Sequence, residues 1–208
     1  MAVALGKHLR DQLARLDWSS FRLDEWQIEA LEEHLEMLRK WNRRMNLTGI
    51  TDLDEIVRRH YGESLLLGSL LPGGGLSVAD VGSGAGFPGY PIAVLRREFR
   101  VALIESNSRK AVFLRQSCRN AENVRVVEGR AEECQQDFDW LVARGVAWRD
   151  LARLVPGLGR SVGVLVGEKG ISELEGDRRI RWQEPVPIPW MRSSVAMLGS
   201  FRSGERST

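Results

Sequence analysis

Hydrophobic side chains in the first third of the chain recur every three or four residues, which is the spacing of one face of an α-helix. The two stripes are Leu9, Leu13 and Leu16, then Ile28, Leu31, Leu35, Leu38 and Trp41. Asp24 precedes the longer stripe and is placed to cap its helix. Pro72 and three glycines after it end the helical region. We therefore expect a helical extension over residues 1–71 that packs on a domain over residues 72–208.

After residue 75 the pattern changes to short apolar runs separated by longer amphipathic stretches. The runs that predict strands are 76–81, 101–105, 124–127, 138–143 and 162–166. Helix-like patterns lie over 91–99 and 110–121. This alternation predicts an α/β fold with a parallel sheet and right-handed crossovers. A last apolar run over 195–201 predicts an antiparallel pair at the end of the chain.

The first predicted strand carries a carboxylate, Asp80, near its end and leads into a turn rich in glycine. Gly82, Gly84, Gly86 and Gly89 follow in quick succession. Glycine adopts backbone conformations that other residues avoid, and it lets a ligand approach main-chain N–H groups closely. Turns of this kind at the carboxyl end of a first strand bind nucleotide-type cofactors. The sequence therefore predicts a cofactor site at this turn.

Two cofactors compete for the glycine turn. The spacing of residues 84–89 matches the dinucleotide fingerprint, and Glu105 follows about 20 residues on, where a ribose-binding acid is expected. The carboxylate of Asp80 would repel a pyrophosphate at close range, but it suits a ligand that carries an ammonium and a sulfonium. An acid followed by alternating glycines resembles the first motif of class I S-adenosylmethionine methyltransferases, whose Rossmann-like sheet has seven mostly parallel strands. S-adenosylmethionine is therefore the favoured cofactor, and a dinucleotide is the alternative.

Later strands supply further candidates in a fold of this class. Ala131 and Glu132 follow the third strand and are expected at the adenine end of the cofactor, although they would also suit an ordinary helix start. Arg144 ends the fourth strand, which faces the transferred methyl group, and it is the best candidate near the reacting atoms. His60 is expected to pack or hydrogen-bond rather than to catalyse. Thr48 lies in a polar break that either faces the cleft or forms a turn.

Composition narrows the class of protein without naming a substrate. The 208 residues are 43% hydrophobic and 28% charged, which is typical of a globular chain. No apolar run reaches the ~20 residues of a membrane span, and charges near the start argue against a secretory signal. Cys118 and Cys134 are too few for a disulfide framework or a cysteine-rich metal site. We expect a cytoplasmic protein without a metal; the net charge of +2 does not by itself indicate nucleic-acid binding.

Several segments together resemble one family, the bacterial 16S rRNA guanine-N7 methyltransferases of the RsmG (GidB) type. They are 41–50 (Trp-Asn-Arg-Arg-Met-Asn-Leu-Thr-Gly-Ile), 59–65 (Arg-His-Tyr-Gly-Glu-Ser-Leu), the glycine turn 80–89, and 109–116 (Arg-Lys-Ala-Val-Phe-Leu-Arg-Gln). The first segment is the most specific, because the glycine turn fits any methyltransferase of the class. The chain departs from the family at Glu63, where the family has a shorter acid, and around Arg144, where it has Ser-Arg-Ala and this chain Ala-Arg-Gly.

The resemblance implies methylation of N7 of one guanine, position 527, in 16S rRNA, by a monomer acting on free rRNA, the 30S subunit or an assembly intermediate. The cofactor residues that it and the glycine turn together suggest are Gly82, Gly84, Phe87, Glu105, Ala131, Glu132 and Arg144. The candidate RNA contacts are Arg58, Arg59, Arg109, Lys110 and Arg192. No general base is expected, because guanine N7 has a free lone pair. Alternatives are a methyltransferase acting on another RNA, a protein or a small molecule, an RNA-binding module without activity, and a nicotinamide-dependent enzyme.

Overall fold

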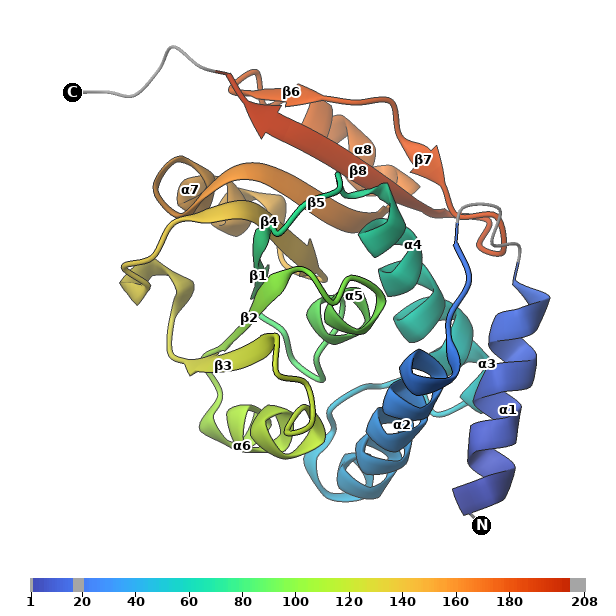
Figure 1. Cartoon of the computed structure of the whole chain (residues 1–208). Coiled ribbons are helices and arrows are strands. Elements are labelled where there is room, and N and C mark those ends of the chain that lie inside the picture. The colour runs from blue at the N-terminus through green and yellow to red at the C-terminus, as the bar shows by residue number, and fades with distance from the viewer. Residues whose placement is uncertain (1, 17–20, 203–208) are drawn as a thin grey trace.

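A mixed β-sheet forms the centre of the computed structural model, which describes residues 2–16 and 21–202 (Figure 1). The strands are β1 (Ser77–Val81), β2 (Arg100–Glu105), β3 (Val124–Glu128), β4 (Phe138–Arg144), β5 (Gly159–Gly167), β6 (Ile180–Trp182), β7 (Val186–Pro187) and β8 (Ser194–Phe201). Their order is β3-β2-β1-β4-β5-β8-β6, and β7 pairs with β8 beside this path. The first five strands are parallel, as the alternating pattern predicts.

The end of the chain closes the sheet with antiparallel strands. β8 pairs with β5 over seven residue pairs, from Ser161 opposite Ser200 to Gly167 opposite Ser194. This confirms the antiparallel pair expected over 195–201. The seven strands expected from the family fold form the continuous path, and the two-residue β7 is an eighth, because it pairs with β8 beside β6.

Helices cover both faces of the sheet in two hydrophobic clusters. The helices are α1 (Ala2–Arg15), α2 (Glu25–Met45), α3 (Leu53–Ile56), a π-helix η1 (Val57–Gly62), α4 (Glu63–Leu70), α5 (Gly89–Leu95), α6 (Ser108–Ser117), a 3-10 helix η2 (Ala131–Glu133), α7 (Trp148–Leu158) and α8 (Glu168–Glu175). Helices α1 to α6 contribute to one cluster, and α7 and α8 contribute to the other. The sheet is thus the middle of three layers (Figure 1).

Local signals explain where several helices begin. Asp24 caps α2 in a capping box, because its carboxylate accepts from the Gln27 N–H and the Gln27 side chain accepts from the Asp24 N–H, both at 2.8 Å. Asn107 caps α6 with its side-chain oxygen alone, which accepts from the Arg109 and Lys110 N–H groups. Helix α5 begins earlier and ends earlier than the expected 91–99, because the glycine turn passes directly into it at Gly89 and Arg96 leaves the helical conformation.

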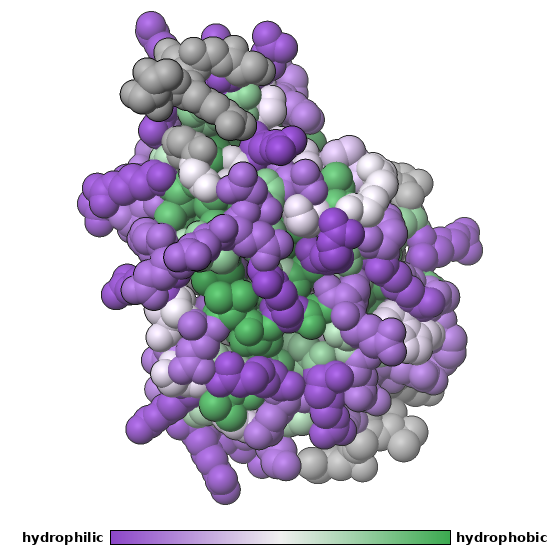
Figure 2. Space-filling model, turned by 60° about the vertical axis from the view of Figure 1, so that its left-hand side comes forward, coloured by the Kyte–Doolittle hydropathy of each residue, from purple (hydrophilic) through white to green (hydrophobic). Residues whose placement is uncertain are grey.

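The N-terminal helices share a core with the sheet. Leu31, Leu35 and Leu38 of α2 are fully buried in the same cluster as Phe113 of α6 and Ile92 of α5. This core contains residues from both sides of the expected boundary between residues 71 and 72, so the division into an extension and a domain stays a prediction. On the face that Figure 2 presents, hydrophilic side chains surround a smaller apolar area. Among the described residues, none of the helices is both long and apolar enough to cross a membrane.

Candidate functional site

Three candidate residues lie at the carboxyl ends of three neighbouring strands. Strand β1 carries Asp80, and it lies between β2, which ends at Glu105, and β4, which ends at Arg144. Parallel strands present their carboxyl ends at one edge of the sheet, so the three residues lie along this edge although 64 residues separate the first from the last. This edge is the crevice in which doubly wound proteins bind ligands.

Asp80 is fully buried under the glycine turn. Its Oδ2 accepts a hydrogen bond from the Gly89 N–H at 2.9 Å, whereas its Oδ1 is buried without a hydrogen-bond partner among the described residues. Burial raises the pKa of Asp80 to about 7. Residue 89 must be glycine, because a Cβ there would lie 2.6 Å from the Cβ of Asp80. The site therefore holds one carboxylate oxygen that a cationic ligand group would satisfy.

The carboxylate of Glu105 holds the glycine turn from the neighbouring strand. Its Oε2 accepts from the Gly84 N–H and its Oε1 from the Asn107 N–H, each at 2.8 Å. Gly82 and Gly84 have φ of 71° and 58°, so the turn needs glycine at both. A ribose hydroxyl pair would compete with these two N–H groups for the same carboxylate. The Glu105 carboxylate is thus already held in place by two N–H groups, which ribose hydroxyls could replace as its hydrogen-bond donors.

The remaining cofactor candidates differ in exposure. The Phe87 side chain is buried and stacks on the ring of His60, with centroids 4.7 Å apart. Ala131 is buried and Glu132 is exposed at the start of η2, after Gly129. No group of three or more metal-ligating side chains occurs in the part of the chain that the structure describes.

Arg144 is held between two side chains of the segment 59–65. Its Nε donates to Oε2 of Glu63 at 3.1 Å, and its Nη1 donates to Nδ1 of His60. The side chains of Arg144 and Glu63 are 18% and 3% exposed, so this ion pair is largely removed from water. Burial raises the pKa of Glu63, and the guanidinium groups of Arg144 and Arg59 oppose that rise. The resemblance marked Glu63 only as a departure; its pairing with Arg144 needed the fold.

His60 links Arg144 to the polar break after α2. Its Nε2 lies 2.7 Å from Oγ1 of Thr48. Asn42 holds the backbone of Thr48 from both sides, since its amide donates to the Thr48 carbonyl at 3.0 Å and accepts from the Thr48 N–H at 2.9 Å. Asn46 ends α2 in the left-handed conformation, with φ of 47°. These contacts give the most specific family segment a physical role, which is to place the Thr48 hydroxyl against His60.

The candidate RNA contacts fall into two groups. The first group is Arg58 and Arg59, which lie on η1. Arg192 belongs to the same group, because the indole of Trp190, two residues before it, donates to the Arg58 carbonyl at 3.1 Å. Arg58 and Arg192 are exposed, and Arg59 pairs with Glu55 at 3.1 Å. Arg109 and Lys110 begin α6, where their N–H groups bond to the capping residue Asn107. Both groups therefore lie on elements that adjoin the three strand ends.

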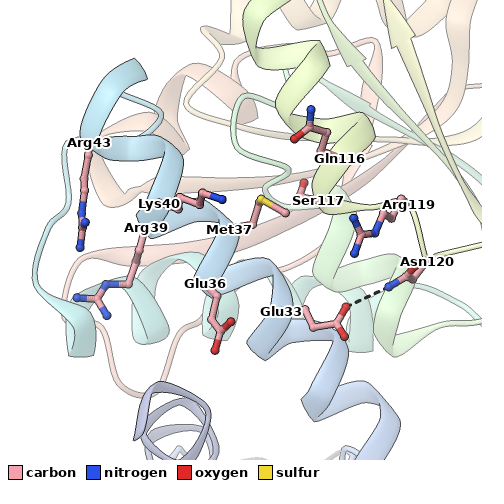
Figure 3. Close-up of a pocket in the computed structure, with 10 residues that line it drawn as sticks. All are labelled: Glu33, Glu36, Met37, Arg39, Lys40, Arg43, Gln116, Ser117, Arg119 and Asn120. Atoms are coloured by element: carbon pink, nitrogen blue, oxygen red, sulfur yellow. Dashed lines mark hydrogen bonds between the residues drawn. The ribbon is translucent and has the colours of Figure 1, made fainter. Parts of the chain in front are cut away.

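A separate hollow of about 540 Å³ lies between α2 and α6 (Figure 3). Its lining residues are Glu33, Glu36, Met37, Arg39, Lys40, Arg43, Gln116, Ser117, Arg119 and Asn120. None of them is a candidate cofactor residue. The hollow is therefore distinct from the edge that carries Asp80.

Three features define a class I S-adenosylmethionine-dependent methyltransferase fold. They are the order of the strands, Asp80 near the end of β1 with the glycine turn that follows, and Glu105 at the end of β2. Solved structures agree on the fold: a 23S rRNA methyltransferase, ErmE, has a TM-score of 0.55 at 17% identity, covering 70% of this chain and 69% of its own. A methyltransferase from Aquifex aeolicus has a TM-score of 0.55 at 14% identity, covering 71% and 93%.

The chain belongs to the rRNA small subunit methyltransferase G family, whose model matches residues 27–179. A curated member from Halorhodospira halophila is 39% identical over 168 residues, which are 79% of this chain and 77% of that protein. A member from Stenotrophomonas maltophilia is 36% identical over 182 residues, which are 82% and 85% of the two chains. These matches confirm the family expected from the sequence.

Proposed function

We propose that this chain transfers the methyl group of S-adenosylmethionine to N7 of one guanine, position 527, in 16S rRNA. Membership of a family named for the methylation of small-subunit rRNA supports this reaction. The observation that carries it within the chain is the placement of Asp80, Glu105 and Arg144 along one edge of the sheet. A dinucleotide fits this edge poorly, because the free Oδ1 of Asp80 would repel its phosphates.

The first strand and its turn are proposed to hold the cofactor. Asp80 would bind a cationic part of its methionine portion, the main chain at Gly82, Gly84 and Phe87 would line its path, and Glu105 would accept from the ribose hydroxyls. Ala131 and Glu132 are proposed to lie at the adenine. When bound, S-adenosylmethionine supplies a methyl group activated by the adjoining sulfonium.

The chain then has to orient the guanine rather than move a proton. N7 of guanine carries a free lone pair at neutral pH, so no general base is needed. Positioning alone can contribute several kcal/mol, up to ~7–11 kcal/mol in the best intramolecular cases. Arg144 is proposed to border the reacting atoms, because it ends the strand next to Asp80 and is anchored by Glu63 and His60.

The rRNA is proposed to be held mainly through its phosphates, since N7 lies on a base edge that is accessible in open or distorted RNA. The proposed contacts are Arg58, Arg59, Arg109, Lys110 and Arg192. We further propose a monomer that works in the cytoplasm on free 16S rRNA, the 30S subunit or an assembly intermediate. The helical residues 1–71 are proposed as an extension of the catalytic domain 72–208.

Incubation with methyl-labelled S-adenosylmethionine tests this function. The substrates are naked 16S rRNA and assembled 30S subunits, both from cells that lack the modification, and the labelled nucleotide is mapped by nuclease digestion and mass spectrometry. We expect one 7-methylguanosine, at position 527, and no label with Arg144→Ala. Label at another nucleotide, or none in either substrate, would refute the proposal and favour another RNA, a protein or a small molecule as substrate.

A further inference from the structure

We infer that Thr48 and His60 are positioning residues that hold the Arg144 guanidinium in the orientation that methyl transfer needs. The inference rests on the proposed function, because it takes Arg144 to border the reacting atoms. Thr48 and His60 act through Arg144, in a line that runs from Oγ1 of Thr48 to Nε2 of His60 and from Nδ1 of His60 to Nη1 of Arg144.

The chemistry of the three side chains determines the direction of every bond in this line. A guanidinium only donates, so Nδ1 of His60 must accept and the ring proton must sit on Nε2. Oγ1 of Thr48 must then accept from His60, and it also accepts from the Ile50 N–H at 3.1 Å. Burial, aided by the charge of Arg144, lowers the pKa of His60 to about 3, which agrees with a neutral ring that accepts from a cation.

The surroundings leave the ring one useful orientation. Phe87 stacks on one side of it at an interplanar angle of 19°, and Asn42 fixes the backbone of Thr48. Without the Thr48 hydroxyl, the Nε2 proton of a buried ring would lose its acceptor. The ring could then turn over or change tautomer, and a proton on Nδ1 would point at the guanidinium. Arg144 would keep Glu63 but lose its second anchor.

Isosteric substitutions of Thr48 test this role. Thr48→Val removes the hydroxyl at nearly constant volume, Thr48→Ser keeps it, and Thr51→Val is the matched control at an exposed threonine in the same segment. Steady-state kinetics on the rRNA substrate should show kcat lowered about tenfold or more in Thr48→Val, with an unchanged affinity for S-adenosylmethionine. Thr48→Ser should keep most of kcat, and Thr51→Val all of it.

Nitrogen-15 NMR of labelled histidine gives a readout that packing loss alone would not move. The wild-type His60 ring should show the Nε2–H tautomer, and Thr48→Val should shift the ring toward the other tautomer. Equal kcat in Thr48→Val and Thr48→Ser, or a wild-type ring protonated on Nδ1, would overturn the inference. Both outcomes are read on a wild type that methylates its guanine, so they are distinct from failure of the proposed function.

A second inference concerns the hollow between α2 and α6. We infer that it binds the phosphates of rRNA that flanks the target guanine, which again rests on the proposed function. Its cations are Arg39, Lys40 and Arg43 from α2 and Arg119 from the turn after α6 (Figure 3). None of these four forms an ion pair among the described residues, although Glu33 and Glu36 line the same hollow, and Glu33 bonds to Asn120 at 3.1 Å.

The balance of charge in the hollow supports this reading. Four of its lining side chains are cationic, against two carboxylates, Glu33 and Glu36. The two helices that border the hollow also lead to residues of the proposed site, because Asn42 near the end of α2 bonds to Thr48 and α6 begins just after Glu105. Unpaired cations in an open groove favour a polyanion that follows the groove away from the reacting base.

The double variant Lys40→Ala with Arg43→Ala tests the groove against Arg149→Ala with Arg153→Ala, two exposed arginines of α7 on the other side of the sheet. Loss of two phosphate contacts should raise the Kd for 16S rRNA and flatten the slope of log Kd against log salt by about 1.4, at ~0.7 per single-strand contact. Affinity for S-adenosylmethionine should not change. An unchanged salt slope, or an equal change in the α7 control, would overturn the inference.

Discussion

The affinity for S-adenosylmethionine should depend on the protonation of Asp80. Its carboxyl has a pKa of about 7 in the free protein, raised by burial, and one of its oxygens lacks a partner. A cationic ligand group favours the ionised form, so binding below pH 7 must release a proton. With this raised pKa, the ionised fraction of the Asp80 carboxyl grows from about 0.09 at pH 6 to about 0.5 at pH 7, so the affinity should increase with pH.

The apparent Kd equals the intrinsic Kd divided by the fraction of protein in which Asp80 is ionised. We therefore expect S-adenosylmethionine to bind about fivefold more tightly at pH 7 than at pH 6. The amino group of the ligand, with a pKa near that of an α-amine at about 7.7–8.0, stays mostly protonated over this range. Isothermal titration calorimetry in buffers of different ionisation enthalpy should also detect close to one proton released at pH 6.

Asp80→Asn is the control for this titration. An asparagine keeps an acceptor for the Gly89 N–H but cannot ionise, so its affinity should be weaker and independent of pH between 6 and 7. Circular dichroism at both pH values establishes that the variant is folded. A wild-type Kd that is flat between pH 6 and 7, or an equal pH dependence in Asp80→Asn, would refute the role given to this carboxylate.

Three further changes have defined expectations. Burial lowers the pKa of His34 to about 3, so below about pH 6.5 the unfolded chain takes up a proton at this residue that the folded chain does not, and stability falls. His34→Gln removes this titration and should reduce the loss of unfolding free energy between pH 7 and pH 5 by about 2 kcal/mol, measured by urea titration. Gly89→Ala should destabilise the fold by about 1–3 kcal/mol and abolish S-adenosylmethionine binding, since its Cβ meets Asp80; a normal Kd would contradict the geometry. Arg109→Ala with Lys110→Ala should weaken rRNA binding and flatten its salt dependence with cofactor affinity unchanged. A collapse of cofactor affinity would move both residues to the cofactor pocket.

The local pattern of the sequence was sufficient for most strands and for the main helices. The apolar runs that predict strands overlap all five parallel strands. The inner strands are apolar because both faces of the sheet are covered, whereas the edge strand β3 is only partly buried. Asp24 was correctly placed as a helix cap. Helices α7 and α8 and the short strands β6 and β7 were missed. The helix predicted over 91–99 begins too late in the sequence, because glycine and proline at residues 86–89 obscured the start of α5.

The sequence by itself therefore determined the fold class, the glycine turn and the family, since these depend on neighbouring residues and on a continuous motif. Tertiary structure alone decided the partners of each polar group. Thr48, His60, Glu63 and Arg144 come from three separate segments, and only the order β2-β1-β4 with the π-helix η1 against it joins them. The unpaired Oδ1 of Asp80 likewise arises from burial. Burial and hydrogen-bond satisfaction belong to the packed chain, so no local pattern encodes them.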